Sequence, residues 1–445
     1  MTFSLASLLE RLDELESGAN RPARYIVALS GGLDSCVLAS ALAATRDRHG
    51  KSLLAVHVDH QLHPDSAEWS DHCRQLAADF GIDFMVEKVD VDTGSGSGLE
   101  AAARDARYKV LARHVQHDDW LLSAHHRDDQ AETLLLNLMR GSGPAGLRGI
   151  GAINPFADGW LVRPLIDVSR AALQAYAVEA NIDWLEDPAN ENRRFDRNYL
   201  RHAVLPLLEE RWPDVTRRLA RSAELAGEAA ALLEDLAEHD LRAVGDRPGR
   251  IEISGLERLS EQRKRNLLRH AVRRSGLPAP SAAQLCSVLE QLIPAKQDAQ
   301  PLVAWPGAEV RRYRDILYIL PASASEQPVD DGQVLGDTPL QLPQGLGTLS
   351  LSPGVELGLD EAVIEQGLTV HYRRGGEKFQ PAGQVHTRKL KKLLQDEGVV
   401  PWMRERLPLV YAAGRLVAVA DLWIASDAAS EPGTAIRWRD KPVLH

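Results

Sequence analysis

The feature of this sequence that most restricts its fold is the hexapeptide Ser-Gly-Gly-Leu-Asp-Ser at 30–35, directly after the apolar run 25–29. This order predicts a buried strand, a tight turn and the start of a helix. Two glycines allow backbone angles that other residues avoid, and their missing side chains let an anion approach the main chain. The free amides of the first helical turn and the positive end of the helix dipole would then bind phosphates. The segment therefore predicts a nucleotide-binding unit.

Asp34 distinguishes this loop from an ordinary turn rich in serine and glycine. A carboxylate and a phosphate are both negatively charged, so their proximity makes sense when a Mg²⁺ ion binds both of them. No lysine follows the glycines, so the loop is not the G-x-x-x-x-G-K-S/T loop of kinases and GTPases. The pattern S-G-G-x-D-S resembles the PP-loop of ATP pyrophosphatases, which cut ATP to AMP and pyrophosphate. The resemblance implies a nucleotide-binding set of Ser30, Gly31, Gly32, Leu33, Asp34 and Ser35, with Asp34 as a Mg²⁺ ligand.

Strand-like and helix-like patterns alternate over the first ~200 residues, which is typical of an α/β doubly wound parallel sheet. The expected strands are 25–29, 53–58, 84–91 and 120–124, and the expected helices are 34–48, 66–80, 99–117 and 129–140. Ligands of such sheets bind beyond the carboxyl ends of the strands. The hexapeptide, His57 after the second strand and the histidines after the fourth strand are therefore expected to converge on one cleft.

A second polar group lies in the segment 124–133, where Asp129 and Glu132 are three residues apart and so share a helix face. Such a pair could simply be solvated charges that favour the start of a helix. In the same cleft as the PP-loop, the two carboxylates could instead bind Mg²⁺ or a substrate ammonium group. We expect Asp34, Asp129 and Glu132 to be catalytic, with Asp34 and Asp129 as metal ligands.

The rest of the chain predicts two further domains. The segment 169–240 is mostly helical, 250–320 is mixed, and a stretch at 321–332 rich in proline, serine and aspartate is interpreted as a linker. The expected boundaries are 1–215 for the ATP-binding domain, 216–325 for a mainly helical or mixed middle domain, and 340–445 for a small β-rich α+β domain. Two glycine-rich stretches, 94–98 and 140–144, could be lids or plain linkers.

Composition limits where such a protein can act. The three cysteines, Cys36, Cys73 and Cys286, are far apart and fit a reducing compartment rather than a disulfide framework. The N-terminus has a helical pattern interrupted by acidic residues, unlike a signal peptide, and no apolar run reaches the ~18 residues of a membrane span. We expect a soluble, cytoplasmic protein without membrane contact. The net charge of −11 hides local basic segments at 193–221, 263–274 and 371–392.

Several motifs narrow the resemblance beyond PP-loop enzymes in general. They are H-V-D-H-Q-L-H-P-D-S-A-E, L-E-A-A-A-R-D-A-R-Y, A-H-H-R-D-D-Q-A-E-T, R-G-S-G-P-A-G-L, V-R-P-L-I, E-D-P-A-N-E-N-R-R-F-D-R-N-Y-L-R-H-A-V-L-P-L-L, Y-R-R-G-G-E-K-F, R-K-L-K-K-L-L-Q and R-L-P-L-V-Y. In this order they resemble the tRNA(Ile)-lysidine synthase family over essentially the whole chain, most weakly at 225–350. One departure is Asp-His-Gln-Leu-His at 59–63, where the family more often has Asn, His, Gly, Leu and Arg.

The resemblance implies that ATP, with Mg²⁺, adenylylates a carbonyl oxygen of the wobble cytidine in an isoleucine tRNA with the anticodon CAU. The amine of free L-lysine then displaces AMP, and the product lysidine reads AUA instead of AUG. By analogy His57 lies near the adenine, and a cleft-facing Arg104 would serve the nucleotide. Asp129 and Glu132 would bind Mg²⁺ or orient and deprotonate the lysine ammonium. The expected tRNA-binding residues are Arg197, Arg201, Arg265, Arg269, Arg373, Arg374, Lys378, Lys389, Lys391 and Lys392.

Two alternatives stay open. A PP-loop tRNA thiolase would also adenylylate a base, but it needs paired cysteines or an iron–sulfur cluster, and the cysteines here are isolated in sequence. A non-catalytic module could hold ATP and tRNA without turnover, although the complete S-G-G-x-D-S and D-x-x-E sets argue against it. The sequence leaves open whether the protein is a monomer or a homodimer.

Overall fold

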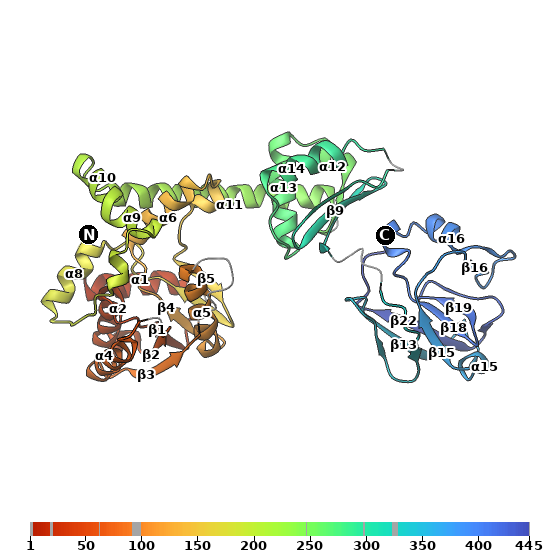
Figure 1. Ribbon diagram of the computed structural model, residues 1–445, viewed down its shortest axis with the longest axis horizontal. Coiled ribbons are helices and arrows are strands. Elements are labelled where there is room, and N and C mark those ends of the chain that lie inside the picture. The colour runs from red at the N-terminus through yellow and green to blue at the C-terminus, as the bar shows by residue number, and fades with distance from the viewer. Residues whose placement is uncertain are drawn as a thin grey trace. The chain divides into compact units, whose positions relative to one another are not determined.

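The computed structural model describes residues 3–17, 21–61, 63–90, 99–245, 247–296, 299–322 and 328–444. The chain divides into two compact units, 1–232 and 233–445 (Figure 1). The second unit contains two separate hydrophobic cores. The three domain boundaries expected from the sequence stay a prediction.

The first unit is built on a six-stranded sheet with the order β3-β2-β1-β4-β6-β5. The strands are β1 (Arg24–Ala28), β2 (Ser52–Asp59), β3 (Asp83–Lys88), β4 (Trp120–Leu122), β5 (Ile153–Phe156) and β6 (Gly159–Val162). Every neighbouring pair is parallel except β5 and β6. The predicted doubly wound parallel sheet is confirmed, but the sequence analysis predicted neither β6, which extends its parallel part, nor the antiparallel edge strand β5.

Helices cover both faces of this sheet. They are α1 (Leu5–Ser17), α2 (Leu33–Ala44), α3 (Arg46–His49), α4 (Ser66–Asp79), α5 (Leu99–His114), α6 (Arg127–Met139), α7 (Pro144–Leu147) and α8 (Arg170–Glu179). Alternate residues of β1 point to opposite faces: Tyr25 and Val27 pack with α1, α2, α4 and α8, whereas Ile26 packs with Leu111 of α5. Strand β1 is buried on both sides, which explains its uninterrupted apolar run.

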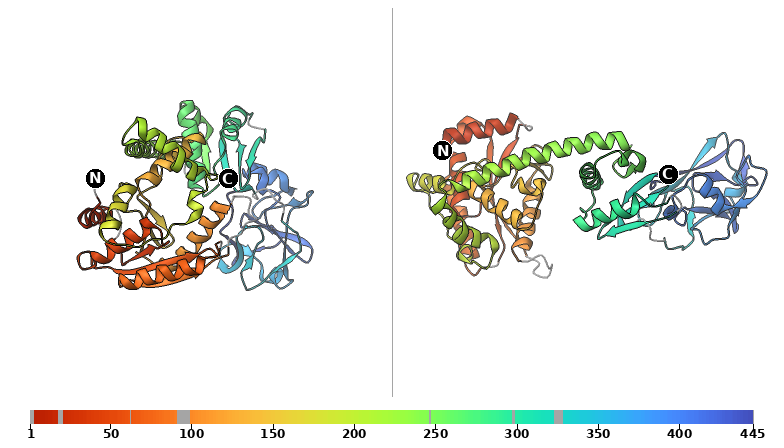
Figure 2. Two further views of the ribbon diagram at one scale, coloured as in Figure 1. Left: turned by 60° about the vertical axis from the view of Figure 1, so that its left-hand side comes forward. Right: turned by 90° about the horizontal axis from the view of Figure 1, so that it is seen from above.

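A helical segment follows the sheet. It consists of η1 (Pro188–Glu191), α9 (Asp196–Tyr199), η2 (Leu200–Val204), α10 (Leu205–Arg211) and α11 (Val215–Val244). Helix α11 is continuous over its whole length, and the boundary between the two units falls inside it (Figure 2). None of the helices in the described ranges is long and apolar enough to cross a bilayer.

The second unit begins with a mixed region whose antiparallel sheet has the order β7-β10-β9-β8. Its elements are β7 (Arg250–Glu252), α12 (Ile253–Glu257), α13 (Glu261–Arg274), α14 (Ala282–Ser287), η3 (Val288–Leu292), β8 (Leu302–Trp305), β9 (Ala308–Tyr313) and β10 (Ile316–Leu320). Buried residues such as Ile251, Leu267 and Leu317 form its core. The linker expected at 321–332 lies partly outside the described residues.

The remainder of the second unit is β-rich, as predicted. Two five-stranded sheets and a two-stranded ladder are formed by β11 (Gln333–Leu335), β12 (Leu340–Gln341), β13 (Thr348–Val355), β14 (Gly358–Leu359), β15 (Leu368–His371), β16 (Lys378–Phe379), β17 (Arg388–Lys389), β18 (Leu409–Ala412), β19 (Arg415–Val419), β20 (Trp423–Ile424), β21 (Ala429–Ser430) and β22 (Gly433–Arg439). The short helices are α15 (Glu361–Ile364), α16 (Leu390–Asp396) and η5 (Pro401–Met403).

Candidate active site

A cavity of about 910 Å³ opens at the carboxyl ends of β1, β2 and β4. These ends meet because β1 pairs in parallel with both other strands. The sequence-predicted residues that line the cavity are Ser30, Gly32, Leu33, Asp34, Ser35, His57, Asp129 and Arg201. Three segments that are distant in sequence therefore do converge. Gly31, Arg104, Glu132 and Arg197 lie outside this lining.

The hexapeptide forms a turn between β1 and α2. Gly31 has a φ of +85°, and Gly32 is the extended residue that precedes the first turn of α2. The first backbone bond of the helix runs from the N–H of Cys36 to the carbonyl of Gly32 over 3.1 Å. The N–H groups of the three residues before Cys36 have no acceptor within the helix, so they are suited to an anion.

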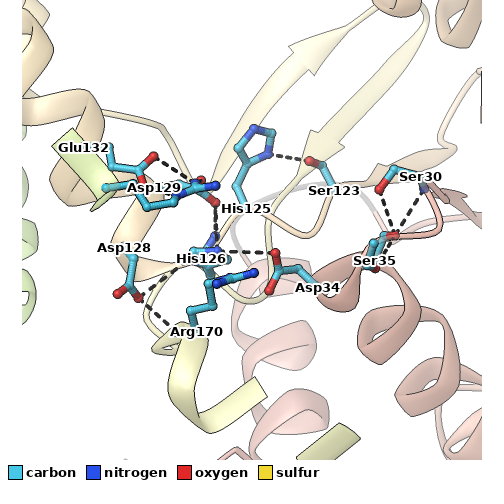
Figure 3. Close-up of polar contacts among 12 residues, drawn as sticks. Ser30, Asp34, Ser35, Ser123, His125, His126, Asp128, Asp129, Glu132 and Arg170 are labelled. Carbon is cyan, nitrogen blue, oxygen red and sulfur yellow. Dashed lines mark hydrogen bonds and ion pairs between the residues drawn. The ribbon is translucent and has the colours of Figure 1, made fainter. Parts of the chain in front are cut away.

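Two serine hydroxyls hold the turn in one shape (Figure 3). Ser35 Oγ donates to the carbonyl of Gly32 over 3.0 Å and accepts the N–H of Ser30 over 3.1 Å. The hydroxyl oxygens of Ser30 and Ser35 are 3.0 Å apart. Because these bonds join the two ends of the turn, its shape is set before any ligand binds.

Gly31→Ala should lower nucleotide-dependent activity by about 10-fold or more, since a side chain at positive φ costs about 1–2 kcal/mol. An added Cβ would also lie 3.0 Å from Cys73 Sγ and 3.2 Å from Leu185 Cδ1, so the loop would have to shift. Release of pyrophosphate from ATP measures the effect. Gly50→Ala is the matched control, because Gly50 has a φ of +66° but nothing within 4 Å of its added Cβ. Equal, small effects of both substitutions would contradict the prediction.

His126 is the centre of the polar cluster in Figure 3. Its buried Nε2 lies 3.5 Å from Asp34 Oδ2 and 3.5 Å from Asp129 Oδ2, and its Nδ1 lies 3.6 Å from Asp128. Burial by itself would lower the pKa of His126, but Asp128, Asp34 and Asp129 raise it to about 10. The ring is therefore an imidazolium that offsets part of the surrounding negative charge.

Asp34 has one carboxylate oxygen without a partner. Its Oδ1 is buried and accepts no hydrogen bond from any described residue. Such an oxygen is costly to bury unless a cation binds it. Within the described ranges no three His, Cys, Asp or Glu side chains form a metal-binding group, so a cation here would be shared with phosphate oxygens. Asp34 therefore fits Mg²⁺ held jointly with a nucleotide.

Both oxygens of Asp129 already accept hydrogen bonds. Oδ2 accepts the N–H of His126 over 2.9 Å, and Oδ1 accepts from Arg201 Nη2 over 3.3 Å. Burial raises the pKa of Asp129, but His126, His125 and Arg197 outweigh it and hold the pKa below its ordinary value. Asp129 therefore presents a permanent negative charge to the cavity, and its geometry suits an ammonium better than a bare metal ion.

Glu132 is fully buried and bound by two arginines. Arg197 Nε donates to Oε2 over 2.8 Å, while Arg201 donates to Oε1 through Nε over 2.6 Å and to Oε2 through Nη2 over 3.0 Å. Burial would lower the pKa of Arg201, yet Glu132 raises it above its ordinary value. The arginines expected to contact tRNA thus point toward the acidic pair that the sequence assigned to catalysis.

Two further predicted residues, His57 and Arg104, differ in whether they reach the cavity. His57 is buried and its Nδ1 lies 2.9 Å from the carbonyl of Leu29; burial lowers its pKa, so the ring is neutral. Arg104 is exposed, with its guanidinium 5.3 Å from the centre of the Tyr108 ring. Arg107 lines the cavity instead, and burial lowers its pKa. The helical spacing of α5 did not show which of the two arginines faces inward.

Other lining residues were not predicted. The segment 184–191 lines the cavity, and Leu185 donates its N–H to the carbonyl of Gly31 over 2.8 Å. Trp69 and His63 also line it, with their rings stacked at 4.7 Å between centroids. Arg170 lines it from the start of α8. His63 and residues 186–191 lie within two of the motifs quoted above, but the motifs did not assign them to the cavity, because their approach depends on how distant segments pack.

The structure describes only one of the two glycine-rich stretches that were expected to be lids or linkers. The stretch 94–98 lies outside the described residues. The stretch 140–144 is joined to α6 by the N–H of Ser142, which donates to the carbonyl of Asn137 over 3.0 Å. The residues after it are also bound to α6: the amide of Gln130 bonds the N–H and the carbonyl of Ile150, and Asn137 donates to the carbonyl of Gly146. These bonds favour a fixed loop over a lid.

The basic segments of the second unit are partly neutralised. On α13, Arg263 binds Asp240 and Arg273 binds Glu234, whereas Arg265 and Arg269 have no acidic partner among the described residues. In the C-terminal region three arginines are paired: Arg373 with Glu377, Arg374 with Asp330 and Arg388 with Asp396. The lysines without an acidic partner among the described residues are Lys378, Lys389, Lys391 and Lys392, and all four are exposed.

Two of these lysines form a like-charged pair. Strands β16 and β17 are antiparallel, and Lys378 stands directly opposite Lys389. Like charges opposite each other in a ladder are destabilising. An anion bound between them would remove the repulsion, so this surface is suited to phosphates.

The sheet, the phosphate loop and the acidic pair at the next strand end define a PP-loop nucleotide-binding protein, and a family model described as "PP-loop domain" matches residues 5–208. Models described as "TilS substrate binding domain" and "TilS substrate C-terminal domain" match 252–318 and 368–439. The chain belongs to the tRNA(Ile)-lysidine synthase family. Its similarity to curated members extends over nearly its whole length.

The chain is 45% identical over 410 residues to the tRNA(Ile)-lysidine synthase of Alkalilimnicola ehrlichii, covering 92% of each chain. It is 40% identical over 427 residues to that of Methylococcus capsulatus, covering 95% of this chain and 97% of the relative. Among solved structures, the U34-tRNA thiolase NcsA from Methanococcus maripaludis is 16% identical, with a TM-score of 0.42 over 50% of this chain and 79% of that chain. This last likeness is too distant to add to the argument.

Proposed function

We propose that the protein joins free L-lysine to the wobble cytidine of an isoleucine tRNA with the anticodon CAU, and converts ATP to AMP and pyrophosphate. In the first step the cytosine carbonyl oxygen attacks the α-phosphorus and pyrophosphate leaves. In the second step the lysine ε-nitrogen bonds to the activated ring carbon, and AMP leaves with that oxygen. The observation that carries the proposal is that the PP-loop and Asp129 line one cavity. We place the reaction in the cytoplasm.

The phosphate side of the cavity has the groups that the first step needs. The amides of the first turn of α2 would bind the pyrophosphate, with the hydroxyls of Ser30 and Ser35 keeping the turn in place. Asp34, whose Oδ1 lacks a partner among the described residues, would hold Mg²⁺. When bound, Mg²⁺ supplies charge neutralisation for the leaving pyrophosphate.

The acidic side would receive lysine. Asp129 is ionised and faces the cavity, so we assign it to binding and orienting the ε-ammonium group and to taking its proton, rather than to the metal. Glu132 cannot reach a substrate, because it is fully buried, does not line the cavity and is bound by Arg197 and Arg201. We therefore give Glu132 a positioning role: it holds the guanidinium of Arg201, which in turn donates to Asp129.

The nucleoside would occupy the remaining side. His57, held by the carbonyl of Leu29, would lie by the adenine. We assign the nucleotide-binding role expected of Arg104 to Arg107, because Arg107 lines the cavity and Arg104 does not.

Sulfur transfer is the rival chemistry, and the cysteines argue against it. Burial raises the pKa of both the Cys36 and Cys73 thiols to about 12. A thiol of this pKa is protonated at neutral pH and is a poor nucleophile. Cys286 is half-buried in the second unit.

The reaction is tested by incubating the protein with ATP, labelled lysine and a CAU-anticodon isoleucine tRNA transcript. Label in the RNA and pyrophosphate release that requires this tRNA support the proposal. Pyrophosphate release without lysine isolates the first step. Folded protein that transfers no label would overturn the proposal, and a bound ATP that is never cleaved would favour the non-catalytic module.

Charge reversal of Lys389, Lys391 and Lys392 should weaken tRNA binding and reduce the slope of log affinity against log salt by about 3, one for each lost phosphate contact. These ammonium groups are exposed and have no acidic partner in the described part of the chain, so no carboxylate there competes with RNA phosphates for them. Binding is measured at several salt concentrations. Lys441→Glu is the control, because Lys441 already contacts Asp421 over 2.6 Å. An unchanged affinity and slope in the triple variant would contradict the prediction.

A further inference from the structure

Three arginines line the cavity: Arg107, Arg170 and Arg201. Arg201 is bound to Glu132 and Asp129 on the acidic side. Arg107 lies on α5, where its guanidinium is 5.9 Å from the centre of the Tyr108 ring. Arg170 is exposed and its guanidinium has no carboxylate partner among the described residues. Arg170 is therefore a cation in the cavity lining that is available to a ligand.

The backbone fixes where Arg170 stands. Asp128 Oδ2 accepts the N–H of Arg170 over 2.9 Å, and the carbonyl of Val168 accepts the N–H of Arg127 over 2.9 Å. These two bonds tie the start of α8 to the start of α6, where Asp129 follows Asp128. In Figure 3 the side chain of Arg170 extends from α8 toward Asp34, and both residues line the cavity. Asp129 lies close to Asp34, because a carboxylate oxygen of each is 3.5 Å from His126 Nε2.

Free lysine brings one carboxylate and two ammonium groups to this side of the cavity. The ammonium groups are matched by carboxylates such as Asp129, but the substrate carboxylate needs a cation. A guanidinium is the side chain best suited to it, because it offers parallel N–H donors to both carboxylate oxygens. The other guanidinium on this side, that of Arg201, is already occupied by Glu132.

We propose that Arg170 binds the α-carboxylate of the lysine substrate and thereby selects an amino acid over a simple amine. This inference rests on the proposed function. With Arg170 at one end and Asp129 at the other, the lysine is held by both of its ends, and its ε-nitrogen is directed to the activated cytidine. A diamine would satisfy Asp129 but leave Arg170 without a partner.

The test compares the wild type, Arg170→Ala and Arg170→Lys with lysine, lysinamide and cadaverine as amine donors. Arg170→Ala should raise the KM for lysine by about 10- to 100-fold, the range of a hydrogen-bonded charge. It should also bring the kcat/KM values for lysine and lysinamide close to each other, and Arg170→Lys should recover part of the preference. The N–H that Asp128 accepts is unaffected by either substitution, so the folded site is retained. Arg113→Ala, on an exposed position of α5 outside the cavity, is the matched control.

Pyrophosphate release with tRNA but without lysine distinguishes a failure of the Arg170 inference from a failure of the proposed function. In Arg170→Ala this release and the KM for ATP should remain at the wild-type values. An unchanged lysine KM and an unchanged preference over lysinamide would overturn the inference. So would a loss of pyrophosphate release in the variant, because the guanidinium would then serve the phosphates. Absence of release in the wild type would instead contradict the proposed function itself.

Discussion

Asp129→Asn is expected to reduce lysine transfer by about 10²–10⁴-fold, the usual effect of removing a group that moves a proton. The amide keeps the size of the side chain and can still accept the N–H of His126, so α6 should begin as before. What is lost is the negative charge that faces the cavity and would hold the ε-ammonium. Pyrophosphate release that depends on tRNA but not on lysine should stay within a few-fold of the wild-type rate.

The two half-reactions of the Asp129→Asn variant are measured on the same preparation. Asp47→Asn, an exposed change on α3, controls for the loss of one negative charge from the first unit. If the variant loses pyrophosphate release as strongly as lysine transfer, Asp129 serves the nucleotide or its metal, and our assignment to the amine is wrong.

Glu132→Gln is expected to lower the free energy of unfolding by about 1–3 kcal/mol, the usual cost of removing a charged hydrogen-bond partner from a buried site, because Arg201 keeps its contact with Asp129. Here two guanidinium groups, those of Arg197 and Arg201, would lose the carboxylate that both of them bind. Arg201 would also lose the contact that aligns it with Asp129, so lysine transfer should fall together with stability.

Urea unfolding of the whole chain measures the change in stability. Glu14→Gln removes the same charge from an exposed pair with Arg11 on α1, where about 0–1 kcal/mol is the usual contribution. A Glu132→Gln variant as stable as Glu14→Gln would show that the two arginines find other partners, and would remove the basis for the positioning role.

The sequence predicted the sheet and the cleft because both depend on local patterns. An apolar run followed by two glycines must be a buried strand and a turn, and parallel strands bring Asp34, His57 and Asp129 to one edge. Strands β5 and β6 were missed because both are only four residues long: Ile-Asn-Pro-Phe has neither alternation nor a continuous apolar run, and Gly-Trp-Leu-Val begins with glycine.

The charged residues show the limit of such patterns. Arg197 and Arg201 are more than sixty residues from Glu132, and nothing in their own segment indicates a buried carboxylate nearby. Helical spacing places Arg104 and Arg107 within one turn of α5 but cannot tell which of them faces a cavity. Which charged side chains pair in the folded protein depends on tertiary packing. Residue types and their spacing along the chain do not show that packing.

The close approach of Gly31, Cys73 and Leu185 has an evolutionary consequence. The three residues lie in different parts of the sequence, yet the space beside the Gly31 Cα is bounded by the sulfur of Cys73 and the side chain of Leu185, and Leu185 also bonds the Gly31 carbonyl. They share one packing volume, so a larger residue at position 73 must be matched by a smaller one at 185. Among homologues these two positions should covary in size while position 31 stays glycine.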